Sequence, residues 1–214
     1  MAEDKKDHGA STDKLHLAYH SKSSQETARV YDDWADEYER HMKNAGYTHP
    51  AVVAAMAARH VAPTDQRVLD AGAGTGVLGE ILRALGYSNL FGLDASQGML
   101  EIAGLKDNYR ELSHQFLGQP LEYDDDSFVL VTSSGVFTQG HAPLDGLDEL
   151  VRVTRPGGYL VFSVARTYLD GPFEQKRQRL DSAGRWRFVD ASERYNSAPL
   201  EDQLISQVFV FQVA

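Results

Sequence analysis

The chain has 214 residues, which suits one α/β domain with a core large enough to be stable alone, and its formal net charge is −10. This charge argues against a broad phosphate-binding surface, so we expect neither duplex DNA nor bulk RNA as a partner. The absence of cysteine excludes disulfides and thiolate metal sites and favours a cytoplasmic protein, and no apolar run approaches a membrane span or a secretory signal.

The first 22 residues are polar, and we expect them to form a flexible tail ahead of a single domain over residues 23–214. Histidines in this tail are irregularly spaced, which is more typical of a surface than of a metal site, so we assign no metal. These histidines are His8, His16 and His20.

Residues 23–44 have the pattern of one helix. Tyr31, Trp34 and Tyr38 recur at intervals of three and four, so they lie on one face. This aromatic face either only packs on the domain or forms a lid over a ligand, because aromatic rings with polar tips suit the border of a pocket. A second helix, over residues 50–60, is apolar around much of its circumference and should pack tightly.

Residues 66–79 combine a short apolar run with a glycine-rich turn. The pair at 68–69 fits a buried strand, Asp70 follows it, and a helical pattern begins at Val77. The turn between them has glycine at alternate positions, Gly72, Gly74 and Gly76. Glycine permits positive φ and close approach of a ligand to the main chain, and the helix start offers unpaired N–H groups. The segment therefore predicts a site for the polar part of a nucleotide-like ligand, the alternative being a turn that only allows tight packing.

The glycine spacing differs from the dinucleotide fingerprint G-x-G-x-x-G. Val77 stands where the third glycine of that fingerprint would be, and Asp70 precedes Gly72 by two residues. A carboxylate there would repel a pyrophosphate and attract a ligand that carries an ammonium group and a sulfonium. An NAD-dependent oxidoreductase is therefore disfavoured, although it stays open as an alternative.

Asp94 ends the next expected strand, residues 89–93, and lies 24 positions after Asp70. An acid at this place can accept hydrogen bonds from both hydroxyl groups of a ribose, which indicates an adenosine-containing ligand. Alternatively, Asp94 caps the helix that begins near Ser96. Met99 of that helix either touches the adenine or belongs to the core.

The rest of the chain alternates between strand and helix patterns. Further strands are expected over residues 114–117, 127–131, 159–164, 186–189 and 205–213, and further helices over 143–154 and 173–183. The basic cluster at residues 176–179 fits a solvated helix face better than a nucleic-acid patch. A loop over residues 132–141 should face the same edge of the sheet as Asp94. Its His141 is a candidate general base, a helix cap or a surface residue.

The acid-x-G-x-G-x-G pattern at residues 70–76 resembles motif I of the class I S-adenosylmethionine-dependent methyltransferases. Asp94 and the turn Arg155–Gly158 fit the same family, and residues 31–38 resemble its segment before motif I. The resemblance implies an α/β, Rossmann-like, seven-stranded sheet in the order 3-2-1-4-5-7-6, with strand 7 antiparallel and helices on both faces. Three segments, Y-D-D-W-A-D-E-Y, L-G-Q-P and F-E-Q-K-R-Q-R-L-D-S-A-G-R-W, are similar to a methyltransferase-like group of the Williams–Beuren syndrome chromosomal region.

The resemblance also implies S-adenosylmethionine as cofactor, S-adenosylhomocysteine as product, and a lid helix over the methionine part. Where the family often has an acid that contacts adenine, this chain has Gly118 and Gln119, whose main chain or amide would have to replace that contact. The candidate cofactor-binding residues are Tyr31, Trp34, Tyr38, Asp70, Ala71, Gly72, Gly74, Asp94, Ala95, Met99, Gly118, Gln119, Ser134 and Gly135.

These observations predict a methyltransferase that acts on a small or medium-sized acceptor. The alternative is a non-catalytic protein that binds S-adenosylmethionine or S-adenosylhomocysteine as a sensor or partner subunit. Methyl transfer is an in-line displacement that depends largely on positioning and water exclusion, so no general base is obligatory. The sequence indicates neither the attacking atom of the acceptor nor the oligomeric state.

Overall fold

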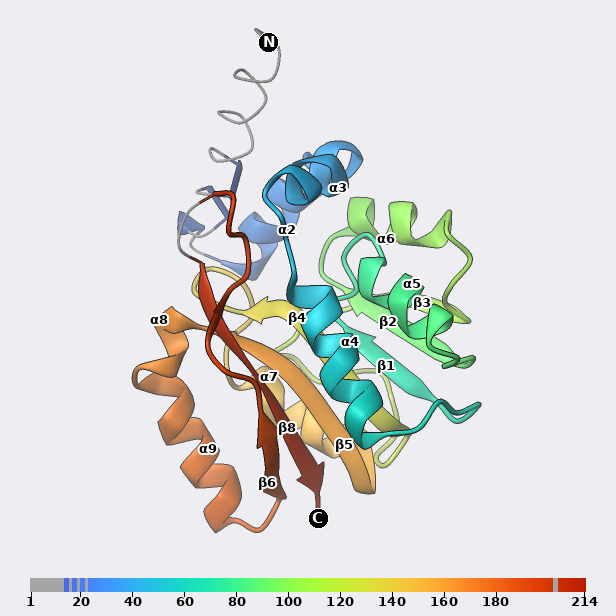
Figure 1. Cartoon of the computed structure of the whole chain (residues 1–214), viewed down its shortest axis with the longest axis vertical. Helices are drawn as coiled ribbons and strands as arrows, with labels where there is room; N and C mark the ends of the chain where they lie inside the picture. Colours follow the sequence, from blue (N-terminus) through green and yellow to red (C-terminus); the bar gives the residue numbers. More distant parts are fainter. Residues whose placement is uncertain (1–13, 16, 19, 22, 202–203) are drawn as a thin grey trace, which may run out of the picture.

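The structure is a computed structural model that describes residues 14, 15, 17, 18, 20, 21, 23–201 and 204–214. A twisted sheet runs through its centre, with helices on both faces (Figure 1). The helices are α2 (Ser24–Asp32), α3 (Ala35–Asn44), α4 (His49–His60), α5 (Val77–Ala84), α6 (Gln97–Gly104), α7 (Gly146–Val153), α8 (Arg166–Leu169) and α9 (Pro172–Ser182). The strands are β1 (Val68–Ala71), β2 (Leu90–Asp94), β3 (Glu111–His114), β4 (Phe128–Phe137), β5 (Thr154–Ala165), β6 (Trp186–Ala191), β7 (Tyr195–Asn196) and β8 (Ile205–Val213).

The order of the strands is β3-β2-β1-β4-β5-β8-β6, and the short β7 pairs with β8. The pairs formed among β1 to β5 are all parallel, whereas β8 runs antiparallel to both β5 and β6. The expected order is confirmed. The strand expected as the seventh is β8, because β7 is too short to leave a pattern in the sequence.

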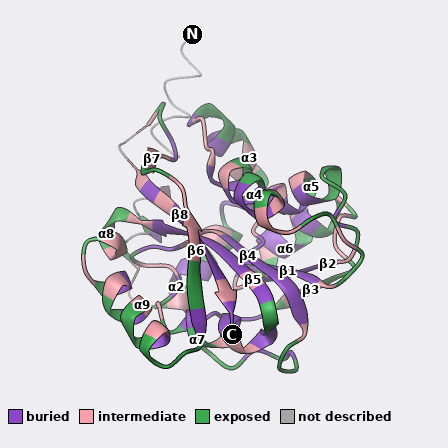
Figure 2. Ribbon diagram, turned by 60° about the horizontal axis from the view of Figure 1, so that its bottom comes forward, coloured by how far each residue is buried: buried purple, intermediate pink, exposed green. Residues whose placement is uncertain are grey.

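Successive residues of the central strands point to opposite faces of the sheet. In β1, Val68 joins the apolar cluster under α4 and α5, while Leu69 joins the cluster under α7 and α9. In β5, Val161 and Phe162 divide in the same way. Because both faces are covered, the middle of the sheet is buried (Figure 2).

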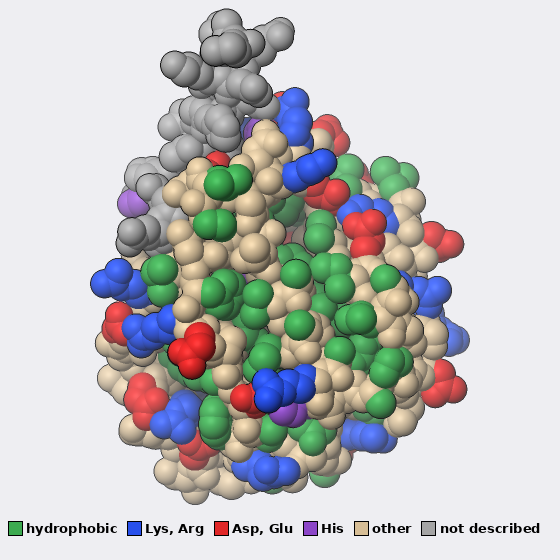
Figure 3. Space-filling view, in the orientation of Figure 1, with side chains coloured by type: hydrophobic (Ala, Val, Ile, Leu, Met, Phe, Trp, Pro, Cys, Tyr) green, Lys and Arg blue, Asp and Glu red, His purple; other side chains and the backbone are tan. Residues whose placement is uncertain are grey.

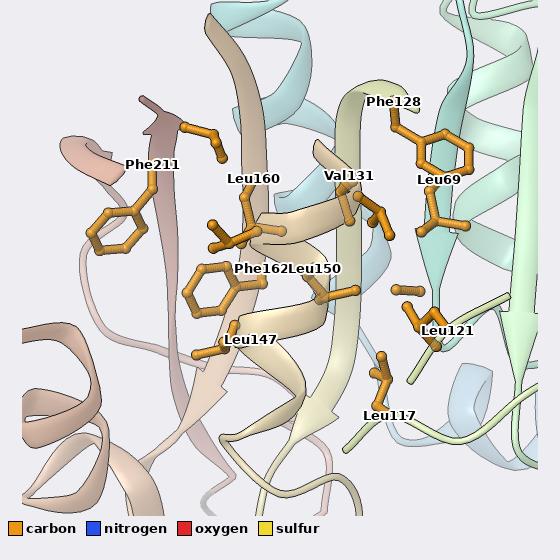
Figure 4. Packing of buried hydrophobic residues seen from close by; sticks show 14 of the residues in the cluster. Leu69, Leu117, Leu121, Phe128, Val131, Leu147, Leu150, Leu160, Phe162 and Phe211 are labelled. Atoms are coloured by element: carbon orange, nitrogen blue, oxygen red, sulfur yellow. The ribbon is translucent and has the colours of Figure 1, made fainter. Parts of the chain in front are cut away.

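The larger of the two clusters lies between the sheet and α7. Leu147 and Leu150 of α7 are fully buried against Phe162 of β5 and Val131 of β4 (Figure 4). Burial of one such leucine contributes roughly 1.5–3 kcal/mol. This packing fixes β4 and β5 relative to β1, and with them the edge at which the parallel strands end.

The prediction of a single helix over residues 23–44 is wrong in one respect. The chain forms two helices, α2 and α3, which are separated by Asp33 and Trp34. Trp34 is fully buried, and its indole N–H donates to Nδ1 of His41 at 2.6 Å. At the end of α2, Oδ1 of Asp32 accepts hydrogen bonds from the Ser96 hydroxyl at 2.6 Å and the Gly98 N–H at 2.9 Å. These contacts with distant parts of the chain turn α3 away from the axis of α2.

The expected N-terminal tail lies mostly outside the described residues. Of those described, residues 14, 15, 17, 18 and 20 are helical, and Ala18 is fully buried. The Lys14 ammonium donates to the main-chain oxygen of Asp33 at 2.9 Å, so this part of the chain contacts the link between α2 and α3.

The face of the molecule shown in Figure 3 carries apolar side chains across its middle, with charged groups of both signs interspersed around them. Lys and Arg do not gather into a continuous patch on this face. Within the described residues, no helix has the length and apolar composition needed to cross a membrane.

Candidate functional site

The glycine turn between β1 and α5 has the backbone geometry that its sequence requires. Gly72, Gly74 and Gly76 have φ angles of 86°, 54° and 86°, which residues with side chains rarely adopt. A Cβ on Gly72 would lie 2.2 Å from a methyl carbon of Val136, whereas a Cβ on Gly74 would meet nothing within 4 Å. Gly72 is therefore needed for packing, and Gly74 exposes its main chain to open space.

Asp94, at the end of β2, fixes this turn. Its Oδ2 accepts the N–H of Gly74 at 2.8 Å, and its Oδ1 accepts the N–H of Ser96 at 2.9 Å. Burial raises the pKa of Asp94, and main-chain hydrogen bonds from Ser96, Gly74 and Ala95 oppose that rise. Each oxygen has a further lone pair, so the carboxylate can still accept hydrogen bonds from a ligand. The helix cap of α6 is Ser96, whose hydroxyl accepts the N–H of Met99 at 3.1 Å.

Asp70 lies beneath the turn and is fully buried. Its Oδ2 accepts the hydroxyl proton of Tyr109 at 2.7 Å, and its Oδ1 has no hydrogen-bond partner in the part of the chain that the structure describes. Burial raises the pKa of Asp70 to about 7, because the hydrogen bond from Tyr109 lowers the pKa by less than burial raises it, and Asp94 adds a further rise. The Tyr109 ring fits only because glycine occupies position 79, where a Cβ would lie 2.3 Å from the ring.

Strand β3 lies earlier in the chain than residues 114–117, where the sequence placed it. It is an edge strand over Glu111–His114 with a single apolar side chain, Leu112, and therefore has a weak hydrophobic pattern. Phe116 and Leu117, which suggested a strand, instead turn over the carboxyl edge of the sheet. This shift places residues 115–117, rather than Gly118 and Gln119, beside the open space at this edge.

Strand β4 continues to Phe137, so the loop expected over residues 132–141 begins only after that residue. The Gly135 N–H of this strand donates to the Ser163 hydroxyl of β5 at 2.7 Å, while the buried Ser134 hydroxyl oxygen has no hydrogen-bond partner within residues 14–214 as far as they are described. His141 lies in the loop that follows. Its Nε2 lies 2.6 Å from the Tyr31 hydroxyl, and burial lowers its pKa to about 4.

Several cavities adjoin one another at this edge: a central one, an outer one, and a third between the glycine turn, α3 and the start of α5. The central cavity lies between the glycine turn, the ends of β2 and β3, and α2. It shares Tyr31, Tyr38, Tyr47, Gly135 and His141 with an outer cavity that extends toward α8 and β8. The outer cavity holds about 420 Å³, within the range typical of small-molecule sites. The central cavity holds about 120 Å³, so a nucleoside-sized ligand would have to extend into adjoining space or displace the α2–α3 segment.

Most of the candidate residues from the sequence line the central cavity, and five do not. Those in the lining are Tyr31, Tyr38, Gly72, Gly74, Asp94, Ala95, Met99, Ser134 and Gly135. Those outside it are Trp34, Asp70, Ala71, Gly118 and Gln119.

The sequence missed other parts of the lining. The start of α2 is tied to the loop between β4 and α7, because the Thr27 hydroxyl donates to the Gly140 carbonyl at 2.5 Å. No local sequence pattern predicts this contact. Gln115 and Phe116 would have been found only with β3 in its correct place. The other lining residues missed are Ser24, Thr27, Ala28, Tyr47, Leu93, Ser96, Leu117, Val136 and Ala142.

Residues 69–162 match the family described as Methyltransferase domain. The chain is 36% identical to human methyltransferase-like protein 27 over 164 residues, which is 73% of this chain and 66% of that protein. It is 30% identical over 178 residues to malonyl-[acyl-carrier protein] O-methyltransferase of Salmonella typhimurium, covering 82% of this chain and 64% of the relative. The chain thus spans about two thirds or less of the length of these relatives.

Solved structures show the same fold at low sequence identity. A TehB-like S-adenosylmethionine-dependent methyltransferase from Corynebacterium glutamicum has a TM-score of 0.62 at 20% identity, with 87% of this chain and 100% of that chain covered. Geranyl diphosphate C-methyltransferase from Streptomyces coelicolor, solved with S-adenosyl-L-homocysteine, has a TM-score of 0.60 at 12% identity, with 77% of each chain covered. Sequence match, strand order and glycine turn agree, and the chain belongs to the class I methyltransferases, whose cofactor is S-adenosylmethionine.

Proposed function

We propose that this protein binds S-adenosylmethionine at the carboxyl edge of its sheet and transfers the methyl group to a small or medium-sized acceptor. One observation carries the proposal: Gly74 and Asp94 both line the central cavity. Gly74 exposes its main chain there, and the Asp94 carboxylate has lone pairs left to accept hydrogen bonds. A cytoplasmic location, which the cysteine-free sequence favours, is part of the proposal.

The chain's residues suit the parts of this cofactor. The Asp94 carboxylate accepts hydrogen bonds from the ribose hydroxyls, and Met99 with Gln115 and Phe116 borders the adenine. The buried Ser134 hydroxyl, which has no hydrogen-bond partner among the described residues, is available to the methionine part.

Asp70 acts from beneath the turn. A cationic ligand above it favours the ionised form of this buried carboxyl group, so binding and ionisation support each other. Direct contact between Asp70 and the ligand is not required for this effect, which agrees with its place outside the cavity lining.

When bound, the cofactor supplies an activated methyl group on a sulfonium. The protein contributes position and exclusion of water, because Tyr31 and Tyr38 of the α2–α3 segment cover the passage between the two cavities. The outer cavity is the place for the acceptor, which enters from the side of α8. Curated relatives act on different acceptors, among them a carrier-bound malonyl group and demethylmenaquinone, so relatives alone do not select one.

The test combines binding and turnover. Calorimetric titration with S-adenosylmethionine should give a single saturable site, and incubation with methyl-labelled cofactor and a deproteinised cell extract should give labelled product and S-adenosylhomocysteine. Binding without product across many extracts would indicate the non-catalytic alternative. Absence of binding would contradict the proposal altogether.

A further inference from the structure

His49, the first residue of α4, lies beside Gly135, a residue that lines both the central and the outer cavity. It lines the outer cavity and is only 6% exposed. A Cβ added at Gly135, which lines both cavities, would lie 3.6 Å from Cδ2 of His49 and 2.3 Å from the Tyr47 hydroxyl. The Cδ2 side of the imidazole, which is the side away from Nδ1 and carries Nε2, therefore lies toward Gly135 at the end of β4.

The position of His49 is fixed by a segment far along the chain. Its Nδ1 lies 2.6 Å from the hydroxyl oxygen of Tyr195, in β7. The preceding residue, Thr48, donates its main-chain N–H to the Ser197 carbonyl at 2.9 Å, which ties the start of α4 to the same segment. The imidazole and the start of α4 are thus both held by residues 195–197.

The hydrogen-bond network defines which ring nitrogen carries the proton. Burial lowers the pKa of His49 to about 3, so the ring is neutral near pH 7. Among the described residues, the Tyr195 hydroxyl has no partner other than Nδ1 of His49. If Nδ1 were the donor, the hydroxyl proton of this partly buried tyrosine would have no acceptor, at a cost of about 1–3 kcal/mol. Tyr195 therefore donates to Nδ1, and Nε2 carries the ring proton.

His141, the other imidazole of the outer cavity, has a different arrangement. Its Nδ1 lies 3.2 Å from the Gln139 carbonyl, which can only accept, so Nδ1 carries the proton of this neutral ring. Its Nε2 then accepts the Tyr31 hydroxyl proton at 2.6 Å. Both nitrogens of His141 are engaged, whereas Nε2 of His49 has no hydrogen-bond partner among the described residues.

We propose that His49 binds the methyl acceptor by donating its Nε2–H to an oxygen of that molecule, and that Tyr195 is the positioning residue that keeps the proton on Nε2. The proposal rests on the proposed function, because it concerns the acceptor of that reaction. It specifies a carbonyl or carboxylate oxygen beside the methylated atom. An acceptor whose only polar group is an amine is disfavoured, since the N–H would occupy the lone pair needed for attack on the methyl carbon.

The first test is nitrogen-15 NMR of the histidine side chains of the full chain, with and without S-adenosylhomocysteine. The His49 ring, assigned by loss of its signals in His49→Gln, should be neutral near pH 7 and protonated on Nε2. In Tyr195→Phe, Nδ1 loses its donor, and the tautomer ratio should shift toward Nδ1–H. The matched control is a second histidine–tyrosine pair, formed by His60 of α4 and Tyr159 of β5. Their ring centroids are 6.2 Å apart, and the pair lines neither cavity, so Tyr159→Phe should leave the tautomer ratio of His49 unchanged.

The second test adds a probe to the protein saturated with S-adenosylhomocysteine. Sodium benzoate and benzamide should shift the Gly135 amide signal saturably, whereas aniline should not. His49→Gln, which keeps an N–H donor, should retain this response, and His49→Leu should weaken benzoate binding by roughly tenfold, the equivalent of about 1.4 kcal/mol.

An Nδ1–H tautomer in the wild type, an aniline response equal to that of benzoate, or no benzoate response would overturn the proposal. Failure of the proposed function looks different, because S-adenosylhomocysteine would then cause no shift at Gly72 or Gly74, while the His49 tautomer would still be readable.

Discussion

Replacement of Asp94 by asparagine tests the assignment of the ribose site. The carboxylate accepts one main-chain N–H on each oxygen, from Gly74 at 2.8 Å and Ser96 at 2.9 Å. Asparagine keeps one acceptor oxygen and places an NH₂ group against one of these donors, so it cannot satisfy both. On the ligand side it also loses an acceptor for one ribose hydroxyl. A hydrogen bond to a charged group contributes about 1.5–3 kcal/mol, so the dissociation constant for S-adenosylhomocysteine should rise roughly 10- to 100-fold.

The assay is calorimetric titration of wild type and Asp94→Asn with S-adenosylhomocysteine, with thermal unfolding of both proteins to confirm that they are folded. The matched control is Asp190→Asn, because Asp190 also accepts a main-chain N–H, from Ala191 at 2.9 Å, but lies on β6 away from the cavity. The control should bind as tightly as wild type. Equal affinity of Asp94→Asn and wild type would refute the ribose assignment.

Three further predictions concern the buried groups around the site and the core. Burial raises the pKa of Asp70 from 3.8 to about 7, so the folded state binds this proton more tightly than the unfolded chain does. The free energy of unfolding should therefore fall as the pH rises from about 4 to about 7, by roughly 4 kcal/mol in total. Urea unfolding at several pH values should show a shallower fall in Asp70→Asn, and identical slopes would contradict this account. Gly79→Ala places a Cβ 2.3 Å from the Tyr109 ring and should destabilise the protein by about 1–3 kcal/mol. Thermal unfolding measures this loss, and an unchanged midpoint temperature would mean that the ring is not confined there. Lys176 is 4% exposed, and its ammonium donates to two exposed carboxylates of the α7 region. Lys176→Ala should therefore lose more stability in urea than Lys176→Met, which keeps the buried stem, and equal losses in the two variants would show that the charge outweighs the packing of the stem.

Features that depend on local sequence were predicted well. The apolar pair before Asp70, the glycines after it and the helical pattern that follows predict a strand, a turn and a helix over residues 68–84, and each is found where the pattern put it. Strand β8, with its regular alternation, was also predicted with its correct bounds, Ile205–Val213. Topology then followed, because the family resemblance supplied an order that the local elements fit.

Features that depend on contacts between distant residues were not predicted. The break between α2 and α3 depends on Asp32 reaching α6 and on Trp34 entering the core, and neither contact is visible in a helical repeat that continues through both helices. Tyr109 reaches Asp70 across 39 positions of the chain, and His49 meets Tyr195 across 146. The sequence therefore indicated the edge of the sheet at which we propose the site, but not which tyrosines and histidines pair there.

The most direct test of the account is a crystal structure of the full chain with S-adenosylhomocysteine. We expect the ribose hydroxyls within hydrogen-bond distance of the Asp94 carboxylate, the amino-acid part against the main chain of Gly72 and Gly74, and the sulfur directed toward Gly135. A complex in which Asp94 contacts only its own main-chain donors, with the ligand bound elsewhere on the molecule, would contradict it.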